Sequence, residues 1–77
     1  MEIKVLGTGC AKCKTQEKYV QDAVAEANVE ATVEKEEDIM KIMQYGVMAT
    51  PAIVIDNEVV AKGRVLSVKE IVKLITQ

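Results

Sequence analysis

The sequence predicts an α/β fold with the element order βαβαββα, in which a mixed four-stranded sheet is flanked by three helices. Three observations lead to this order. Apolar and polar residues alternate in two early segments, residues 2–6 and 29–34, as in strands with one face in water. Between these segments, apolar residues recur at three- and four-residue spacing, as on one side of a helix. The second half holds a short helical pattern, two strand-like runs and a final helix.

The first half of the chain is interpreted as a strand, a helix and a second strand. The first strand covers residues 2–6, and the glycine-rich segment 7–9 ends it. Helical spacing begins at Cys10 and continues for about four turns. It stops at Asn28, a residue type that tolerates the left-handed conformation found at helix ends. The second strand, residues 29–34, is expected to be parallel to the first, with a right-handed crossover.

The second half begins with a short helix and a hairpin. Acidic residues 36–38 favour a helix start, and the helix is expected to end at Gly46. Residues 52–55 are continuously apolar, which is typical of a strand covered on both faces. Residues 56–57 fit a two-residue turn whose asparagine takes a positive φ, and residues 58–61 return antiparallel.

The last helix is predicted to start with a capping box. Ser67 and Glu70 stand three residues apart, so each side chain can satisfy a backbone N–H group of the other. We expect the whole chain, residues 1–77, to form a single domain. The predicted buried face of this helix consists of Val68, Ile71, Val72 and Ile75.

Composition excludes several classes of function. The formal net charge is −2, and two tyrosines are the only aromatic residues. Neither a basic surface nor a stacking platform for nucleic acid is therefore expected. No segment approaches the ~20 apolar residues of a membrane span, and the first residues do not resemble a signal peptide. We expect a cytoplasmic protein with no nucleic-acid or membrane partner.

Cys10 and Cys13 carry the predicted chemistry. They lie at the strand-to-helix junction, where unpaired backbone N–H groups and the helix dipole lower the pKa of a thiol. Gly7 and Gly9 leave Cys10 open to a partner disulfide, and Cys13, one turn deeper, is placed to attack the resulting mixed disulfide. A disulfide that closes so short a ring stabilises by only ~2 kcal/mol. A redox role therefore explains the pair better than a structural one.

Pro51 is the second notable feature, because it is the only proline and directly precedes the most apolar strand. A buried strand accepts proline only at its first residue. The sequence around it leaves open whether its peptide bond is trans and simply starts the strand, or cis.

The segment 7–13, which reads GTGCAKC, is accompanied by Thr50-Pro51 and by GRV at 63–65. Together these motifs resemble the small archaeal and bacterial redox-active disulfide proteins of the thioredoxin/glutaredoxin superfamily, over essentially the whole chain. The resemblance implies a compact thioredoxin-like fold and thiol–disulfide oxidoreductase activity. It implies that Cys10 is the attacking thiol, that Cys13 is the resolving thiol, and that Pro51 is a cis proline facing the disulfide.

The resemblance also implies a substrate groove and a set of partners. Thr50 and Pro51 would offer backbone groups to an extended substrate strand, Met48 and Ala49 would form its apolar lip, and Gly9 would complete the substrate-binding set. The expected partners are protein disulfide substrates and an upstream reductase. No cofactor and no metal are expected, and the protein is expected to be a monomer.

The chain departs from the family pattern at two positions. Gly9 stands where thioredoxins commonly have a tryptophan, and their buried acid falls by counting near Lys4. No proton carrier for Cys13 is therefore identified. The hairpin is not followed by the Gly-Gly-x-Asp pattern of glutaredoxins, so glutathione is not the expected partner.

The alternatives to a redox role use the same two cysteines. They would be ordinary buried residues, part of a zinc site, or ligands of a Cu(I) or other soft-metal carrier. A zinc site needs four ligands, whereas the chain has two cysteines and no histidine. Two thiolates suit Cu(I), but the small copper carriers have the order βαββαβ and end on a strand. Their topology differs from the one predicted here.

Two further groups of residues leave alternatives open. Met40, Met43 and Met48 are possible thioether ligands, although methionines at helical spacing are more often core or an adaptable contact surface. The acidic cluster could dock a basic partner in a non-enzymatic module, or simply start the short helix. This cluster consists of Glu34, Glu36, Glu37 and Asp38.

Overall fold

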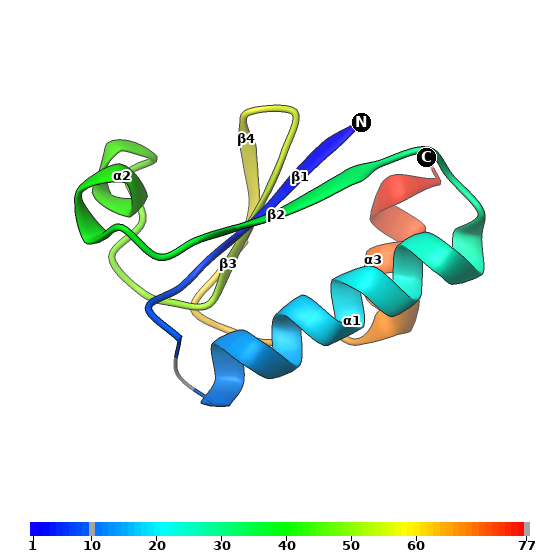
Figure 1. The fold of residues 1–77 in the computed structure, drawn as a ribbon, viewed down its shortest axis with the longest axis horizontal. Helices are drawn as coiled ribbons and strands as arrows, with labels where there is room; N and C mark the ends of the chain where they lie inside the picture. The colour runs from blue at the N-terminus through cyan, green and yellow to red at the C-terminus, as the bar shows by residue number, and fades with distance from the viewer. Residues whose placement is uncertain (10, 77) are drawn as a thin grey trace.

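The computed structural model describes residues 1–9 and 11–76, and Figure 1 traces its course. The element order is βαβαββα, which confirms the α/β prediction. The elements are β1 (Glu2–Leu6), α1 (Ala11–Ala27), β2 (Thr32–Glu36), α2 (Ile39–Gln44), β3 (Ala52–Ile55), β4 (Glu58–Lys62) and α3 (Val68–Ile75). That the chain is one domain over residues 1–77 stays a prediction.

The four strands form one mixed sheet in the order β2-β1-β3-β4. β1 pairs with β2 in parallel and with β3 in antiparallel orientation, and β3 and β4 form an antiparallel hairpin. Both expected pairings, the parallel pair joined by a helix and the hairpin, are confirmed. β1 and β3 occupy the centre of the sheet, so their backbone groups are paired on both sides.

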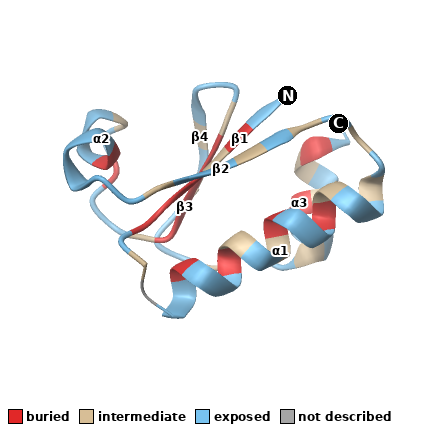
Figure 2. Cartoon of the chain, viewed as in Figure 1, coloured by how far each residue is buried: buried red, intermediate tan, exposed pale blue. Residues whose placement is uncertain are grey.

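Each face of the sheet carries its own core, because alternate residues of a strand point to opposite faces. Ile3 and Val5 of β1 contribute to the first core with buried residues of α1 and α3, whereas Leu6 contributes to the second with Ile42 of α2. In Figure 1, α1 and α3 accordingly lie together, apart from α2. Figure 2 shows that burial is concentrated in the central strands and on the inner sides of α1 and α3.

The second strand begins later than predicted, at Thr32 rather than at residue 29. Its start is determined by its partner, since Glu2 of β1 lies opposite Thr32 and no earlier residue of β1 is available. Val29 and Ala31, which the alternating pattern placed in the strand, instead pack against the first core from the connection after α1. The interpretation of residues 29–34 as the strand was therefore wrong at both ends.

The predicted turns are confirmed by their backbone angles. Asn28 ends α1 with φ 53°, and Asp56 and Asn57 have φ 49° and 68°. Two successive positive values match the tight hairpin turn whose twist fits paired strands. Gly46 follows α2 with φ 76°, as the predicted helix end requires.

The capping box at the start of α3 is also confirmed. The Glu70 backbone N–H donates to the Ser67 Oγ at 3.2 Å, and the Ser67 N–H donates to the Glu70 Oε1 at 3.5 Å. Of the predicted inner face, Ile71 and Ile75 are buried, while the two valines, Val68 and Val72, are only half-buried at the margin of the core. Within the described residues, no helix has the length and apolarity to cross a membrane.

Candidate thiol site

The predicted site lies where the central strand β1 turns into α1. The Gly7 N–H donates to the Glu36 carbonyl at 2.9 Å, which fixes the start of this turn to the end of β2. Gly9 has φ 89°, a value that favours glycine. Cys10 lies outside the described residues, but its chain neighbours Gly9 and Ala11 are described, and Ala11 is the first residue of α1.

Cys13 is buried on the inner side of α1, with 3% of its surface exposed. A Cβ atom on Gly7 would overlap the Cys13 Sγ and would lie 2.8 Å from its Cβ. The Cys13 side chain therefore occupies the space beside Gly7. That Gly7 also leaves Cys10 open to a partner disulfide stays a prediction, because Cys10 lies outside the described residues.

The Thr50–Pro51 peptide bond is cis, which confirms the prediction made from the family resemblance. Pro51 is buried at the start of β3, and its carbonyl accepts the Gly63 N–H at 3.0 Å. Ala49 is exposed, and its Cβ lies 3.2 Å from the position that a Cβ on Gly63 would take. The connection before β3 is thus held against the end of the β4 hairpin.

An apolar pocket joins the turn after β1 to the connection before β3. Thr8 and Thr50 line it from these two segments, and Met43 and Met48 line it from α2 and the segment that follows. Met48 is 99% exposed, and Ile39, Met40 and Met43 are also more than half exposed. These methionines are therefore exposed surface residues and not part of a core. The complete lining is Thr8, Ile39, Ile42, Met43, Val47, Met48 and Thr50.

The structure thus unites only some of the predicted substrate-binding residues. Thr50 lines the pocket together with Thr8, which sequence reasoning did not select. Ala49 instead lies against Gly63. Gly9 faces Glu37, whose Oε2 lies 3.6 Å from the position of a Cβ on Gly9.

A short chain of ion pairs runs beside this turn. The Lys35 Nζ lies 3.0 Å from the Glu37 Oε1 and 3.8 Å from the Glu17 Oε2. The hydrogen bond to Glu37, followed by the attraction of Glu37 and Glu17, raises the pKa of Lys35 above its ordinary value. Glu37 is thereby held between Gly9 and Lys35.

Two further members of the acidic cluster, Asp38 and Glu36, also make local contacts. Asp38 caps α2, since its Oδ1 accepts the Met40 N–H at 2.9 Å. The Glu36 Oε1 lies 3.7 Å from the Lys41 Nζ. These contacts favour the interpretation of the cluster as a helix start over that of a docking surface for a basic partner.

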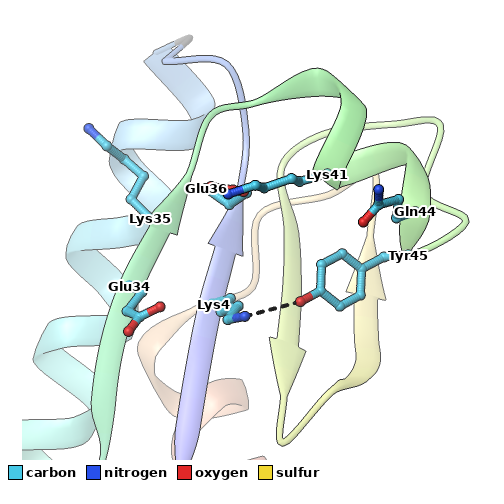
Figure 3. A pocket seen from close by; sticks show the side chains of 7 residues that line it. All are labelled: Lys4, Glu34, Lys35, Glu36, Lys41, Gln44 and Tyr45. Atoms are coloured by element: carbon cyan, nitrogen blue, oxygen red, sulfur yellow. Dashed lines mark hydrogen bonds and ion pairs between the residues drawn. The ribbon is translucent and has the colours of Figure 1, made fainter.

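Lys4 lines a polar hollow between the sheet and α2 (Figure 3). Its Nζ donates to the Tyr45 hydroxyl at 3.2 Å and lies 3.3 Å from the Glu2 Oε1. The hydrogen bond to Tyr45, and then that to Glu2, raises the pKa of Lys4. Figure 3 draws the lining, which is Lys4, Glu34, Lys35, Glu36, Lys41, Gln44 and Tyr45.

Gln16, one turn beyond Cys13, is a residue that sequence reasoning missed. Its side chain is fully buried, its Nε2 donates to the Leu66 carbonyl at 3.1 Å, and its Oε1 accepts the Leu66 N–H at 2.6 Å. The only signal in the sequence is a polar residue three positions after Cys13 on the inner side of a helix. Gln16 fixes this part of α1 to the segment before α3.

The fold order separates the chain from the soft-metal carriers considered above. It ends on α3, and the hairpin follows α2, whereas the carrier order ends on a strand. Within residues 1–9 and 11–76, no group of three or more His, Cys, Asp or Glu side chains is arranged to hold a metal ion.

Comparison with known proteins gives consistent matches over this fold. Residues 1–76 match the family model described as a thioredoxin domain. The chain is 38% identical over 76 residues to a thioredoxin of Methanothermobacter thermautotrophicus, covering 99% of both chains. It is also 36% identical over 69 residues to a thioredoxin of Methanocaldococcus jannaschii, covering 90% of this chain and 79% of that protein.

Proposed function

Because the chain belongs to the thioredoxin family and is thus a thiol–disulfide oxidoreductase acting on protein disulfides, we propose that Cys10 and Cys13 are its redox pair. The observation that supports this assignment best is the position of Cys13, buried within the first turns of α1 against the segment that follows β1. Cys10 precedes α1 in the sequence, where unpaired helix N–H groups favour a thiolate.

The reaction proceeds in two exchange steps. The Cys10 thiolate attacks one sulfur of a substrate disulfide, a Cys10–substrate disulfide forms, and the other substrate sulfur leaves as a thiolate that takes a proton from solvent. The Cys13 thiolate then attacks the Cys10 sulfur and releases the second substrate thiol. The substrate gains two electrons, and the pair becomes a Cys10–Cys13 disulfide. An upstream reductase restores the dithiol.

The substrate groove is proposed to run along the apolar pocket lined by Thr8 and Thr50. Thr50 and Pro51, with Ala49 and Gly9, form the expected binding set, and Thr8 joins them because it lines the pocket with Thr50. The exposed Met43 and Met48 side chains suit varied apolar segments, because methionine adapts to irregular partners. Apolar side chains next to the substrate disulfide would enter this pocket.

Reduction of insulin by the dithiothreitol-reduced protein tests the assignment of the two thiols. Cys10→Ser is expected to abolish turnover. Cys13→Ser is expected to accumulate a mixed disulfide at Cys10 that mass spectrometry of a proteolytic digest identifies. Thr15→Ser, at an exposed position of α1, is the control and should retain the parent rate. Full turnover by the Cys10→Ser variant would contradict the proposal.

A soft-metal carrier is the alternative that uses the same two thiolates. Titration of the reduced protein with Cu(I) against a tight chelator separates the two functions. Strong Cu(I) retention without insulin reduction would favour the carrier. Insulin reduction that depends on Cys10 supports the oxidoreductase. The cytoplasmic location and the monomeric state stay predictions.

A further inference from the structure

Gly7 is held in place and lacks the strain that commonly explains a glycine. It is buried, and its N–H is bonded to the Glu36 carbonyl at 2.9 Å. Its φ lies outside the positive range, unlike those of Gly9, Gly46 and Gly63. The backbone at this position is therefore open to any residue, and only space explains the glycine.

That space is occupied by the Cys13 side chain. A Cβ on Gly7 would overlap the Cys13 Sγ, and it would lie 2.8 Å from the Cys13 Cβ, closer than the 3.0 Å that real Cβ contacts respect. Rotation of the Cys13 side chain moves the sulfur but not its Cβ, whose position is set by the α1 backbone. A larger residue at position 7 must therefore displace the start of α1 itself.

The start of α1 cannot shift easily, because contacts further along the helix hold its position. Gln16, three residues beyond Cys13, is tied to both backbone groups of Leu66. Val20 and Ala23 are fully buried in the first core. A shift at Cys13 would therefore change the position of its sulfur relative to the turn that precedes the helix.

We propose that Gly7 is the positioning residue of the resolving thiol. The backbone of Gly7 is the surface on which the Cys13 sulfur rests, so the residue at position 7 determines the second exchange step and not the first. This inference rests on the proposed function, in which Cys13 attacks the mixed disulfide at Cys10. Displacement of an attacking atom by about 1 Å costs on the order of 100-fold in rate.

The test uses 5,5′-dithiobis(2-nitrobenzoate), which reports both steps in one experiment. Attack by Cys10 releases one thionitrobenzoate, and attack by Cys13 on the mixed disulfide releases the second. In Gly7→Ala, the first release is expected within about twofold of the parent and the second at least about tenfold slower. The equilibrium constant of the disulfide against dithiothreitol should change by about tenfold, which corresponds to about 30 mV.

Gly46→Ala is the matched control. Gly46 has φ 76°, and a Cβ there meets nothing within 4 Å, so alanine adds backbone strain without touching Cys13. Both releases should stay within about twofold of the parent. A normal second release in Gly7→Ala would overturn the inference, as would equal slowing in Gly7→Ala and Gly46→Ala. Absence of a Cys10-dependent first release from the parent would overturn the proposed function as well.

A further variant covers the case in which Gly7→Ala does not fold. Cys13→Gly removes the two atoms that a Cβ on Gly7 would overlap, the Cys13 Sγ and Cβ, and leaves the Cα at an ordinary 3.9 Å. The double variant Gly7→Ala/Cys13→Gly should then regain the folded circular dichroism spectrum, whereas failure to regain it would show that Cys13 is not the obstacle.

Discussion

The side-chain amide of Gln16 makes the hydrogen bonds that a neighbouring backbone segment would otherwise make to Leu66. Burial of Gln16 is tolerated because both ends of its amide are bonded to Leu66, and burying a hydrogen-bonded polar group costs less free energy than burying an unpaired one. Its partners lie 50 residues away in the chain. The side chain therefore connects α1, which carries Cys13, to the segment that leads into α3.

Gln16→Leu is expected to lower the free energy of unfolding by about 2–4 kcal/mol, because it leaves the Leu66 N–H and carbonyl buried and unbonded. Urea denaturation measures the change. Gln21→Leu, at an exposed position of the same helix, should change the free energy by less than about 0.5 kcal/mol. Equal stability of the two variants would mean that water replaces the amide at Leu66.

At the scale of single elements, α3 depends on its first turn. Ser67→Ala is expected to lower the free energy of unfolding by about 1 kcal/mol through loss of the N-cap. Thermal and urea denaturation measure the loss, and the rate of thiol exchange should not change. A variant as stable as the parent would mean that the Ser67 hydroxyl does not hold the Glu70 N–H in solution.

The same cap makes the stability of α3 depend on pH. The hydrogen bond from the Ser67 N–H, together with the Arg64 guanidinium, lowers the pKa of Glu70 below its ordinary value of 4.5. A carboxylate with a lowered pKa stabilises the fold above its unfolded pKa and loses that effect as pH falls through its folded pKa. The stability difference between the parent and Glu70→Gln should therefore be full at pH 7 and shrink below about pH 4.5. A difference that stays constant down to pH 2 would contradict the prediction.

α2 and the segment after it carry exposed apolar side chains, which we propose as the substrate surface. Replacing Met43 and Met48 together with glutamine keeps their length and removes their affinity for apolar partners. The KM for insulin should rise by about tenfold, equivalent to about 1.4 kcal/mol, while the rate with 5,5′-dithiobis(2-nitrobenzoate) should not change. Val60→Gln on β4 removes exposed apolar surface outside the pocket and is the control. A parent-like KM in the double variant would mean that Met43 and Met48 do not contact the substrate.

At the scale of the whole molecule, two cores share one sheet of four short strands. A chain of this length is expected to be stable by only about 4–12 kcal/mol. Ile71→Ala, in the middle of the first core, should cost about 2–5 kcal/mol and thus a large part of this stability. Ile39→Ala on exposed α2 should cost less than about 0.5 kcal/mol. Urea denaturation of both variants checks this contrast.

Beyond the element order, the local details that the sequence predicted correctly are those that depend on near neighbours. The capping box of Ser67 and Glu70, and the turn at Asp56 and Asn57, each involve residues within three positions. The start of β2 was misplaced because it depends on where β1 begins, about thirty residues earlier, and an alternating pattern has no information on register.

The site was predictable to the same extent. Cys13 and Pro51 were selected from their motifs, and the cis bond followed from the resemblance. The close approach of Gly7 to Cys13, and the bond of Gln16 to Leu66, are created only when separate segments pack together. The spacing of residues along the chain does not reveal such contacts.

The amide of Leu66 has an unusual property, because its hydrogen bond at 2.6 Å goes to a side chain and not to another backbone group. Its proton can exchange with deuterium only when its hydrogen bond to the Gln16 Oε1 breaks, since amide exchange requires the bond to open. In native-state hydrogen exchange, the exchange rate of this one proton therefore reports how often α3 separates from α1. A rate equal to that of the amides of β1 means that the carboxyl-terminal part opens only with the entire protein. A faster rate identifies α3 as a unit that detaches while the sheet and the thiol site stay folded.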